Sequence, residues 1–297
     1  MWPRAHRFEW EISLSEFQRF GTWEQAVQWL REQPEKRELV LAAYYDDPLR
    51  EAASRYWRSE EWQAIKLLLP ASGGCALDVG AGRGIASYAL AKEGFHVTAL
   101  EPDPSMLVGA GAIRALAAET GLPVDVAQDF SERLPFADGQ FDVVFARAVL
   151  HHTKDLQAAC REFLRVLKPG GRLVAVREHV ISRPEDLPAF LDLHPLHKLY
   201  GGENAFLLPQ YEAAIRGAGF QLEVVLSPLE SAINFAPYTL DTLKSEVTLR
   251  VTRGLPGLKH LVQGVLALPP VWAAARRVLA RFDHRPGRLY SFIAQRP

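Results

Sequence analysis

The 297-residue sequence predicts an α/β protein built on a doubly wound, mostly parallel sheet. Short apolar runs and amphipathic helical patterns alternate between residues 75 and 226, which predicts parallel strands joined by right-handed crossovers. A glycine-rich stretch, residues 80–84, joins the first apolar run to the first helical run. A carboxylate, Glu101, ends the second apolar run, where sheets of this kind bind ribose hydroxyls.

The expected elements follow from periodicity. Residues 155–167 place apolar side chains at i, i+3, i+4, i+7, i+8 and i+11, which is one buried helical stripe. The same reasoning predicts strands near 75–79, 95–100, 123–128, 141–147, 172–178 and 220–226, and further helices near 84–93, 103–119 and 209–219.

Residues 1–70 are predicted to form a helical N-terminal extension, or cap, that includes one amphipathic helix over 48–69. This segment holds six of the seven tryptophans, a density that indicates packing against the sheet or over its ligand. Tyr44 and Tyr45 are candidates to close over that ligand.

Composition bounds the class of protein. Hydrophobic content of 48% and charged content of 23% are ordinary for a globular chain. The net charge of −1 offers no basic footprint, so no nucleic-acid partner is expected. Cys75 and Cys160 lie in apolar patterns and are interpreted as core residues. The N-terminal residues show no apolar signal region, and a cytoplasmic location is expected.

The glycine stretch predicts a nucleoside-containing cofactor. Gly80, Gly82 and Gly84 allow a sharp bend and a close approach of a ligand to the main chain. The helix that follows offers free N–H groups at the positive end of its dipole. The dinucleotide fingerprint would need glycine at position 85, which is Ile85, so a dinucleotide is not favoured.

Three segments together resemble the class I S-adenosylmethionine-dependent methyltransferases. They are Leu-Asp-Val-Gly-Ala-Gly-Arg-Gly at 77–84, Leu-Pro-Phe with Asp-Gly-Gln-Phe-Asp at 134–142, and Leu-Lys-Pro-Gly-Gly-Arg-Leu at 167–173. The resemblance covers residues 75–226 and implies a Rossmann-like, seven-stranded sheet whose last strand is antiparallel.

Residues 289–294 are the best candidate for that last strand. The methyltransferase domain would then span 71–297, with residues 227–288 as a helical basic insertion between strands six and seven.

The resemblance implies S-adenosylmethionine as the cofactor and assigns residues to it. Asp78 would face its methionine end or order the loop, and Glu101 would bind the ribose. The family's acidic adenine contact is displaced here by about one residue, so either Asp129 or the backbone near Phe130 would read adenine. The full predicted set is Asp78, Gly80, Ala81, Gly82, Gly84, Glu101, Pro102, Asp129, Phe130 and Arg147.

The reaction needs a base only where the acceptor must lose a proton. His151 and His152 follow strand 141–147 at the sheet edge where ligands bind, and they are the candidate catalytic residues; capping or packing roles are the alternative. The candidate acceptor contacts are Glu178, His179, Tyr200 and Asn204. His179, His194, His197 and Glu203 match no zinc spacing, so no metal is predicted.

The insertion is basic between residues 254 and 288, where six lysines and arginines face one acid, Asp283. It also holds an apolar stretch at 261–275, broken by a proline pair. The two interpretations are amphipathic helices with solvated basic faces, or a dock for an anionic partner such as a membrane surface or a phosphorylated substrate. The second adds a membrane-peripheral location to the expectation.

The leading hypothesis is methyl transfer to a small molecule, a glycan or a lipid head group. Oxygen or carbon is favoured over nitrogen, because no Asn-Pro-Pro-Tyr-like motif follows strand 141–147. The alternatives are a methyltransferase that acts on protein or RNA, and a non-catalytic scaffold that binds the cofactor and holds a partner through the basic insertion. No motif encodes the acceptor or the oligomeric state.

Overall fold

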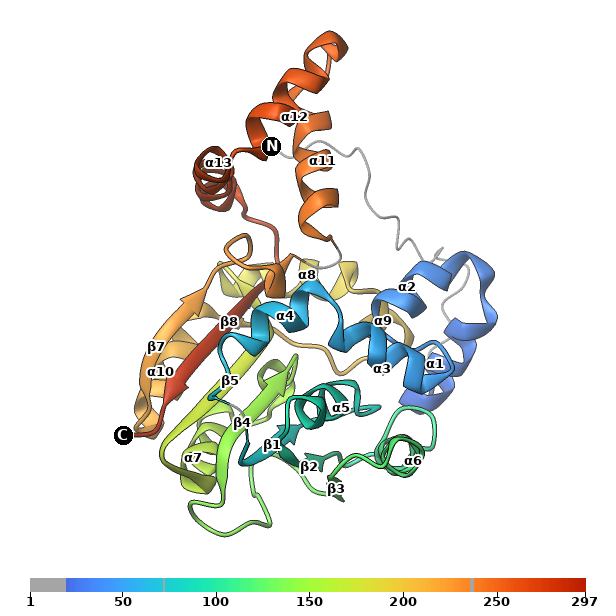
Figure 1. The fold of residues 1–297 in the computed structure, drawn as a ribbon, viewed down its shortest axis with the longest axis vertical. Coiled ribbons are helices and arrows are strands. Elements are labelled where there is room, and N and C mark those ends of the chain that lie inside the picture. Colours follow the sequence, from blue (N-terminus) through green and yellow to red (C-terminus); the bar gives the residue numbers. More distant parts are fainter. Residues whose placement is uncertain (1–19, 72, 236–237) are drawn as a thin grey trace.

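A computed structural model describes residues 20–71, 73–235 and 238–297, and it shows a single sheet flanked by helices (Figure 1). The strand order is β3-β2-β1-β4-β5-β8-β7, with β6 paired to the end of β5. β1 to β5 pair in parallel, whereas β8 runs antiparallel to both of its neighbours. The strands are β1 Cys75–Val79, β2 His96–Leu100, β3 Val124–Ala127, β4 Phe141–Arg147, β5 Leu167–Ile181, β6 Phe206–Leu207, β7 Gln221–Leu226 and β8 Arg288–Gln295.

This architecture confirms the predicted doubly wound fold, including its antiparallel last strand. The sheet has eight strands where seven were predicted, because β5 continues to Ile181 and its extra length pairs with the two-residue β6. Two short helices lie between β5 and β6, α8 at Leu187–Leu193 and α9 at Pro195–Leu199.

Two buried clusters lie on opposite faces of the sheet, because consecutive side chains of a strand point to opposite faces. α7 (Leu156–Val166) and α10 (Leu208–Ala218) cover one face, where Phe163 and Tyr211 are fully buried. α5 (Ile85–Lys92) and the N-terminal helices cover the other face. Cys160 is buried, as its apolar context predicted, whereas Cys75 is only partly buried and packs against the same cluster.

One predicted helix begins later than expected. α6 spans Ala110–Thr120 instead of 103–119. Polar side chains compete for the backbone ahead of it: the Asp103 carboxylate accepts the Ser105 N–H, and the Ser105 hydroxyl accepts the N–H groups of Leu107 and Val108. These bonds hold residues 103–109 as an ordered loop beside the glycine turn.

The N-terminal extension forms four helices, α1 Trp23–Glu32, α2 Arg37–Ala42, α3 Leu49–Trp57 and α4 Glu60–Lys66. α3 and α4 pack against the sheet side of the core, whereas α1 and α2 pack against α9. The predicted single helix over 48–69 is wrong, because Ser59 caps a new helix by accepting the Trp62 N–H at 3.1 Å. Trp62 is fully buried, with its ring 6.0 Å from that of Phe145 in β4. The tryptophans at 2 and 10 lie outside the described residues.

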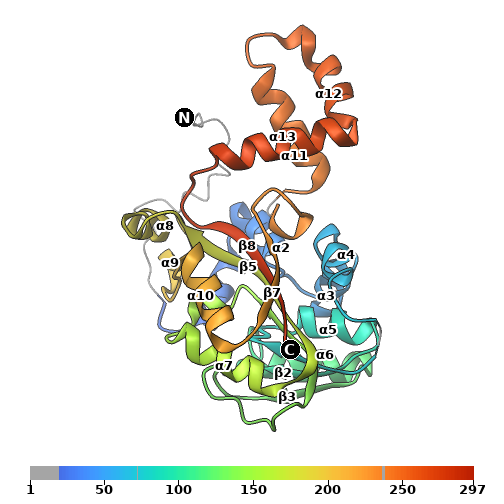
Figure 2. The ribbon, with the colours of Figure 1, turned by 90° about the vertical axis from the view of Figure 1, so that its left-hand side faces the viewer.

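Between β7 and β8 the chain leaves the sheet and forms a helical projection, α11 Leu240–Val251, α12 Lys259–Ala267 and α13 Pro269–Phe282 (Figures 1 and 2). The projection has a small core of its own, which includes Leu243, Val247, Leu266 and Trp272. Across the described parts of the chain, none of the helices combines the length and the apolar character needed to cross a membrane.

Replacing Trp62 by alanine tests whether the N-terminal helices belong to the folding unit. Because the indole is fully buried against β4, Trp62→Ala should lower the free energy of unfolding by about 3–5 kcal/mol in urea denaturation. Leu67→Ala, at the end of the same helix and 84% exposed, is the matched control and should change it by less than about 0.5 kcal/mol. Equal effects of the two substitutions would show that the helix is not packed as described.

Candidate active site

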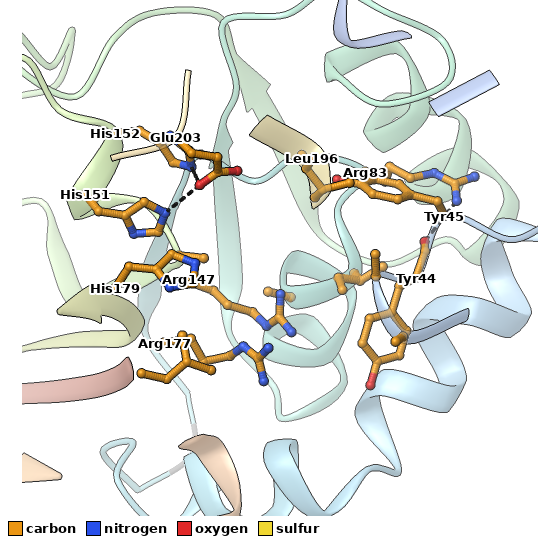
Figure 3. A pocket seen from close by; sticks show the side chains of 18 of the residues that line it. Tyr44, Tyr45, Arg83, Arg147, His151, His152, Arg177, His179, Leu196 and Glu203 are labelled. Atoms are coloured by element: carbon orange, nitrogen blue, oxygen red, sulfur yellow. Dashed lines mark hydrogen bonds and ion pairs between the residues drawn. The ribbon is translucent and has the colours of Figure 1, made fainter. Parts of the chain in front are cut away.

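A cavity of about 1080 Å³ opens at the carboxyl ends of β1, β4 and β5. Its wall combines the glycine loop, the N-terminal helices, residues 194–203 and the base of the helical projection at Tyr238 and Thr239. Figure 3 shows the histidines and Glu203 on one side, Tyr44, Tyr45 and Arg83 on the other, and Arg147 and Arg177 between them. We call these two sides the histidine half and the loop half.

The glycine turn in the loop half depends on residues without side chains. Gly80, Gly82 and Gly84 all have positive φ, at 60°, 54° and 82°. A Cβ on Gly80 would also lie 2.9 Å from Cγ2 of Val149. Both the positive φ and this clash therefore exclude a side chain at position 80. Gly80, Ala81 and Gly82 line the cavity, and Gly84 caps the start of α5 behind them.

Glu101 stands directly behind this turn. Its carboxylate accepts the Gly82 N–H at 2.7 Å and the Asp103 N–H at 3.0 Å. Burial outweighs these bonds and raises the pKa of Glu101 to about 7. A carboxylate oxygen accepts two hydrogen bonds, so both oxygens retain capacity for hydroxyl donors.

Asp78 lies on the cavity wall and is 1% exposed. Burial raises the pKa of Asp78 to about 7, although the Ser87 hydroxyl donates to its carboxylate at 2.6 Å. The described residues provide this carboxylate with no salt bridge. A buried acid that lacks a cationic partner fits the ammonium group of a bound amino-acid moiety.

Gly84 and Glu101 lie behind the turn without lining the cavity, and two more of the predicted cofactor contacts lie elsewhere. Pro102 is exposed and Asp129 is half-buried, and neither lines the cavity; the Asp129 carboxylate accepts the N–H of Phe130 instead. Phe130 does line it and is 67% exposed. Arg147 lines it as well, but its guanidinium is committed to another side chain.

That side chain is Glu61, from α4. Arg147 donates to Glu61 through Nε at 2.7 Å, and Arg177 donates through Nη1 at 3.0 Å. Burial opposes the charge of Arg147, yet Glu61 raises its pKa above the usual value. No local pattern in the sequence predicts this trio, because Glu61 lies on a helix of the cap and Arg177 occupies a bulge in β5 with a φ of 62°.

The cap is also bound to the glycine loop itself. Arg83 donates to the carbonyl oxygens of Tyr44 and Asp46, each at 3.0 Å, and to the Asp47 carboxylate at 2.5 Å. Tyr44 and Tyr45 line the cavity as a result. Contact with the cofactor remains a prediction for both tyrosines.

In the histidine half, Glu178 supports His151 from behind. Glu178 is fully buried and accepts the N–H groups of Val149, Leu150 and His151, each at 3.1 Å. It also accepts from His151 Nδ1 at 2.6 Å. Burial lowers the pKa of His151, but the bond with Glu178 outweighs it and raises the pKa to about 9. All four acceptor sites of Glu178 are occupied, so the predicted contact with the acceptor does not form.

The remaining ring nitrogens converge on Glu203. His152 Nε2 lies 3.8 Å, and His194 Nδ1 3.7 Å, from its carboxylate. The His152 side chain is 42% exposed. Its pKa is lowered, mainly by partial burial of the ring and then by the nearby charge of His151. His179 and Tyr200 line the cavity as predicted for acceptor contacts, whereas Asn204 does not.

Comparisons with known proteins agree with this geometry. Residues 77–175 match the family model described as a methyltransferase domain. Ubiquinone biosynthesis O-methyltransferase of Methylobacterium nodulans is 39% identical over 107 residues, which cover 36% of this chain and 42% of that protein. Demethylmenaquinone methyltransferase of Mycolicibacterium paratuberculosis is 39% identical over 120 residues, covering 40% of this chain and 47% of that protein. The chain thus spans less than half the length of these curated relatives.

Solved structures share the fold across most of the chain. Geranyl diphosphate C-methyltransferase from Streptomyces coelicolor superposes with a TM-score of 0.57 at 18% identity, covering 86% of this chain and 87% of that one. The cyclase SpnF superposes with a TM-score of 0.53 at 22% identity, covering 83% and 81%. Since a cyclase and a methyltransferase share it, the fold alone assigns no reaction.

The sequence match, by contrast, falls on the glycine loop and on strands β1 to β5, and it confirms the predicted family and its cofactor, S-adenosylmethionine. Asp78, the glycine turn and Glu101 are residues that suit that cofactor. Over residues 77–175 the chain therefore contains a domain that matches the methyltransferase-domain family.

Proposed function

We propose that this protein transfers the methyl group of S-adenosylmethionine to a small, largely apolar acceptor at a hydroxyl oxygen or an activated carbon. The observation that carries the proposal is that one cavity joins the glycine loop to the histidine half. Ligand pockets commonly measure ~300–1,000 Å³, so a cavity of about 1080 Å³ has room for a cofactor and a small acceptor together. The names of the quinone-pathway relatives favour the same class of acceptor.

Methyl transfer from a sulfonium places most of the activation on the cofactor. The protein's part is to hold donor and acceptor in line and to exclude water. Asp78 would bind the ammonium group, and Glu101, behind Gly82, would accept from the ribose. The acceptor would lie in the histidine half. There His152, whose pKa is lowered, would accept the proton of the reacting hydroxyl, and His151, which Glu178 keeps protonated, would lie beside it.

The helical projection suggests how an apolar acceptor would reach the cavity. Its surface exposes Val251, Leu255, Leu258, Leu261, Val265, Leu268, Val278 and Phe282. Between residues 254 and 288, six basic residues accompany them, Lys259, Arg276, Arg277, Arg281, Arg285 and Arg288, while the one acid of that stretch, Asp283, is fully buried and paired to Arg285. Apolar and cationic groups on one exposed element match an anionic lipid surface. We therefore propose that the projection docks on such a surface.

Cofactor binding is the first test. Glu101→Ala should weaken binding of S-adenosylhomocysteine by roughly tenfold to a hundredfold in calorimetric titration, because charged acceptors contribute most to hydroxyl recognition. Asp125→Ala removes the same charge from β3 at a side chain that is 73% exposed, and it should leave the affinity unchanged. A Glu101 variant that is folded and binds as well as wild type would contradict the ribose assignment.

The same site predicts a dependence on pH. Burial raises the pKa of Glu101 to about 7, and only the ionised carboxylate accepts fully from ribose hydroxyls. A bound ribose therefore favours the ionised form, and the affinity for the cofactor should rise with pH. The pKa of Asp78 is raised as well, so its ionisation contributes in the same direction. The loss caused by Glu101→Ala should therefore be larger at about pH 8 than at about pH 6. A constant ratio of the two affinities would exclude titration of Glu101 in this range.

Catalysis is tested at the paired histidines. The double variant His151→Ala, His152→Ala should lower turnover by about 10²–10⁴-fold, the range attributed to assisted proton transfer, while leaving the affinity for S-adenosylhomocysteine nearly unchanged. The assay follows transfer of a labelled methyl group to a panel of small phenols and quinols. His96→Ala is the control and should leave turnover unchanged, because His96 begins β2, at the end of that strand away from the cavity. Undiminished turnover in the double variant would remove both histidines from the mechanism.

Membrane docking is tested by sedimentation with vesicles of phosphatidylcholine, with and without phosphatidylserine. Binding should require the anionic lipid, fall with added salt, and weaken about tenfold or more in Leu261→Asp, because a Leu side chain contributes ~1.5–3 kcal/mol when buried. Leu67→Asp introduces the same change on α4, distant in sequence from the projection, and should bind as wild type does. Equal binding to both kinds of vesicle, or equal effects of the two variants, would contradict the proposal.

A further inference from the structure

Three potential metal ligands from two distant segments converge in the histidine half. His151 and His152 follow β4, while Glu203 comes from the segment between α9 and β6. The distances from Glu203 Oε2 to Nε2 of His151 and of His152 are 3.6 and 3.8 Å, and a donor atom from each residue lies within 4.8 Å of the others.

These separations are too long for good hydrogen bonds. They are, however, close to the spacing of ligands around one ion. Two nitrogen or oxygen ligands at ~2.0–2.1 Å from a tetrahedral metal lie about 3.4 Å from each other. A contraction of a few tenths of an ångström would bring each Nε2 atom to that spacing from Glu203 Oε2.

The tautomers of the two histidines are fixed by their other ring nitrogens. His152 Nδ1 lies 2.9 Å from the carbonyl oxygen of Gly202, which can only accept, so Nδ1 carries the proton. His151 Nδ1 lies 2.6 Å from Glu178, whose oxygens already accept three backbone N–H groups. In the neutral form of each ring, Nε2 therefore presents its lone pair toward Glu203. An outer carboxylate or carbonyl that holds the second nitrogen is the usual support of a metal-binding histidine.

Two buried atoms of this group have no hydrogen-bond partner within the described residues, His151 Nε2 and Glu203 Oε2. His151 is 1% exposed, and Glu203 is 11% exposed. Buried polar atoms without a partner are rare in folded proteins, and each calls for an explanation, such as an ion. A shared cation satisfies both atoms and balances the buried carboxylate.

We propose that His151, His152 and Glu203 bind one divalent first-row transition-metal ion through the two Nε2 atoms and Oε2. Imidazole and carboxylate donors without a thiolate suit zinc, iron, nickel or copper more than magnesium or calcium. A second set, His179, His194 and Glu203, also lies within ligand spacing. It is the weaker set because His194 Nδ1, the nitrogen nearest Glu203, already faces the backbone N–H of His197 at 3.4 Å.

The role of the ion rests on the proposed function, but its binding does not. Three protein ligands would leave a coordination position open, as in catalytic metal sites, and all three residues line the cavity. An acceptor hydroxyl bound there would lose its proton to solvent more readily. Its oxygen lone pair would then form the new C–O bond with the methyl carbon, while the C–S bond breaks and its electron pair returns to sulfur. The products are the methyl ether and S-adenosylhomocysteine.

The experiment is metal titration of the tag-free full chain after treatment with a chelator. Calorimetry with Zn²⁺ should show one tight site per chain, and Co²⁺ should give the visible absorption of a low-coordinate ion. His152→Ala and Glu203→Gln should each weaken zinc binding at least tenfold, with circular dichroism confirming that the variants fold. His96→Ala, whose exposed ring pairs with Asp125, is the matched control and should bind as wild type does.

His194→Gln separates the two ligand sets and should retain the site. Absence of a stoichiometric zinc site in the folded wild-type chain would overturn the proposal, and so would loss of the site in His194→Gln but not in His152→Ala. S-adenosylhomocysteine is titrated in parallel. Zinc binding without cofactor binding would refute the proposed function alone, and cofactor binding without zinc would refute the metal site alone.

Discussion

The histidine half of the cavity depends on one buried carboxylate, that of Glu178. A carboxylate removed from water is costly unless donors surround it, and Glu178 meets this requirement with three backbone N–H groups and one imidazole. The same four bonds fix the turn after β4, so they determine where His151 and His152 lie. Losing Glu178 would leave three N–H groups unsatisfied and would free the His151 ring. The position of the reactive side chains is thus set from β5, one strand away from the segment that carries them.

A second group of buried charges joins the N-terminal cap to the sheet. Glu61 of α4 lies between Arg147 and Arg177, while Arg83 of the glycine loop donates to residues 44, 46 and 47. Two arginines share the Glu61 carboxylate, which leaves a positive excess inside the cavity. Removing one partner of such a buried cluster costs more than a surface ion pair is worth. The cap therefore belongs to the cavity wall. The loop half is assembled from segments that come before and after β1 in the sequence.

The sequence predicted what depends on local chemistry. A few adjacent residues are enough to recognise the glycines with positive φ, the acid at the end of β2 and the apolar periodicity of α7. These features predicted the fold and the loop half of the cavity. The sequence failed where side chains meet across long separations. Glu178 was predicted to contact the acceptor, because strand position shows which end of the sheet a residue occupies but not which atoms fill its acceptor sites. The Glu61 cluster and the convergence of His151, His152 and Glu203 were missed for the same reason. No zinc spacing links them, since ligand spacing is local only when one loop supplies the ligands.

Gly287 links the return of the helical projection to the histidine half. Gly287, where the chain returns from α13 into β8, offers its carbonyl oxygen to His179 Nδ1 at 2.9 Å. It has a φ of 75°, and a Cβ there would lie 2.1 Å from the Phe190 ring, so only glycine fits between the projection and α8. His179 in turn packs on His151, with ring centroids 4.7 Å apart. Gly287 therefore holds the His179 imidazole, and that ring contacts His151, one of the proposed reactive residues. If the projection docks as we propose, a shift of α13 on the membrane would move that carbonyl and with it the hydrogen bond that orients the His179 ring.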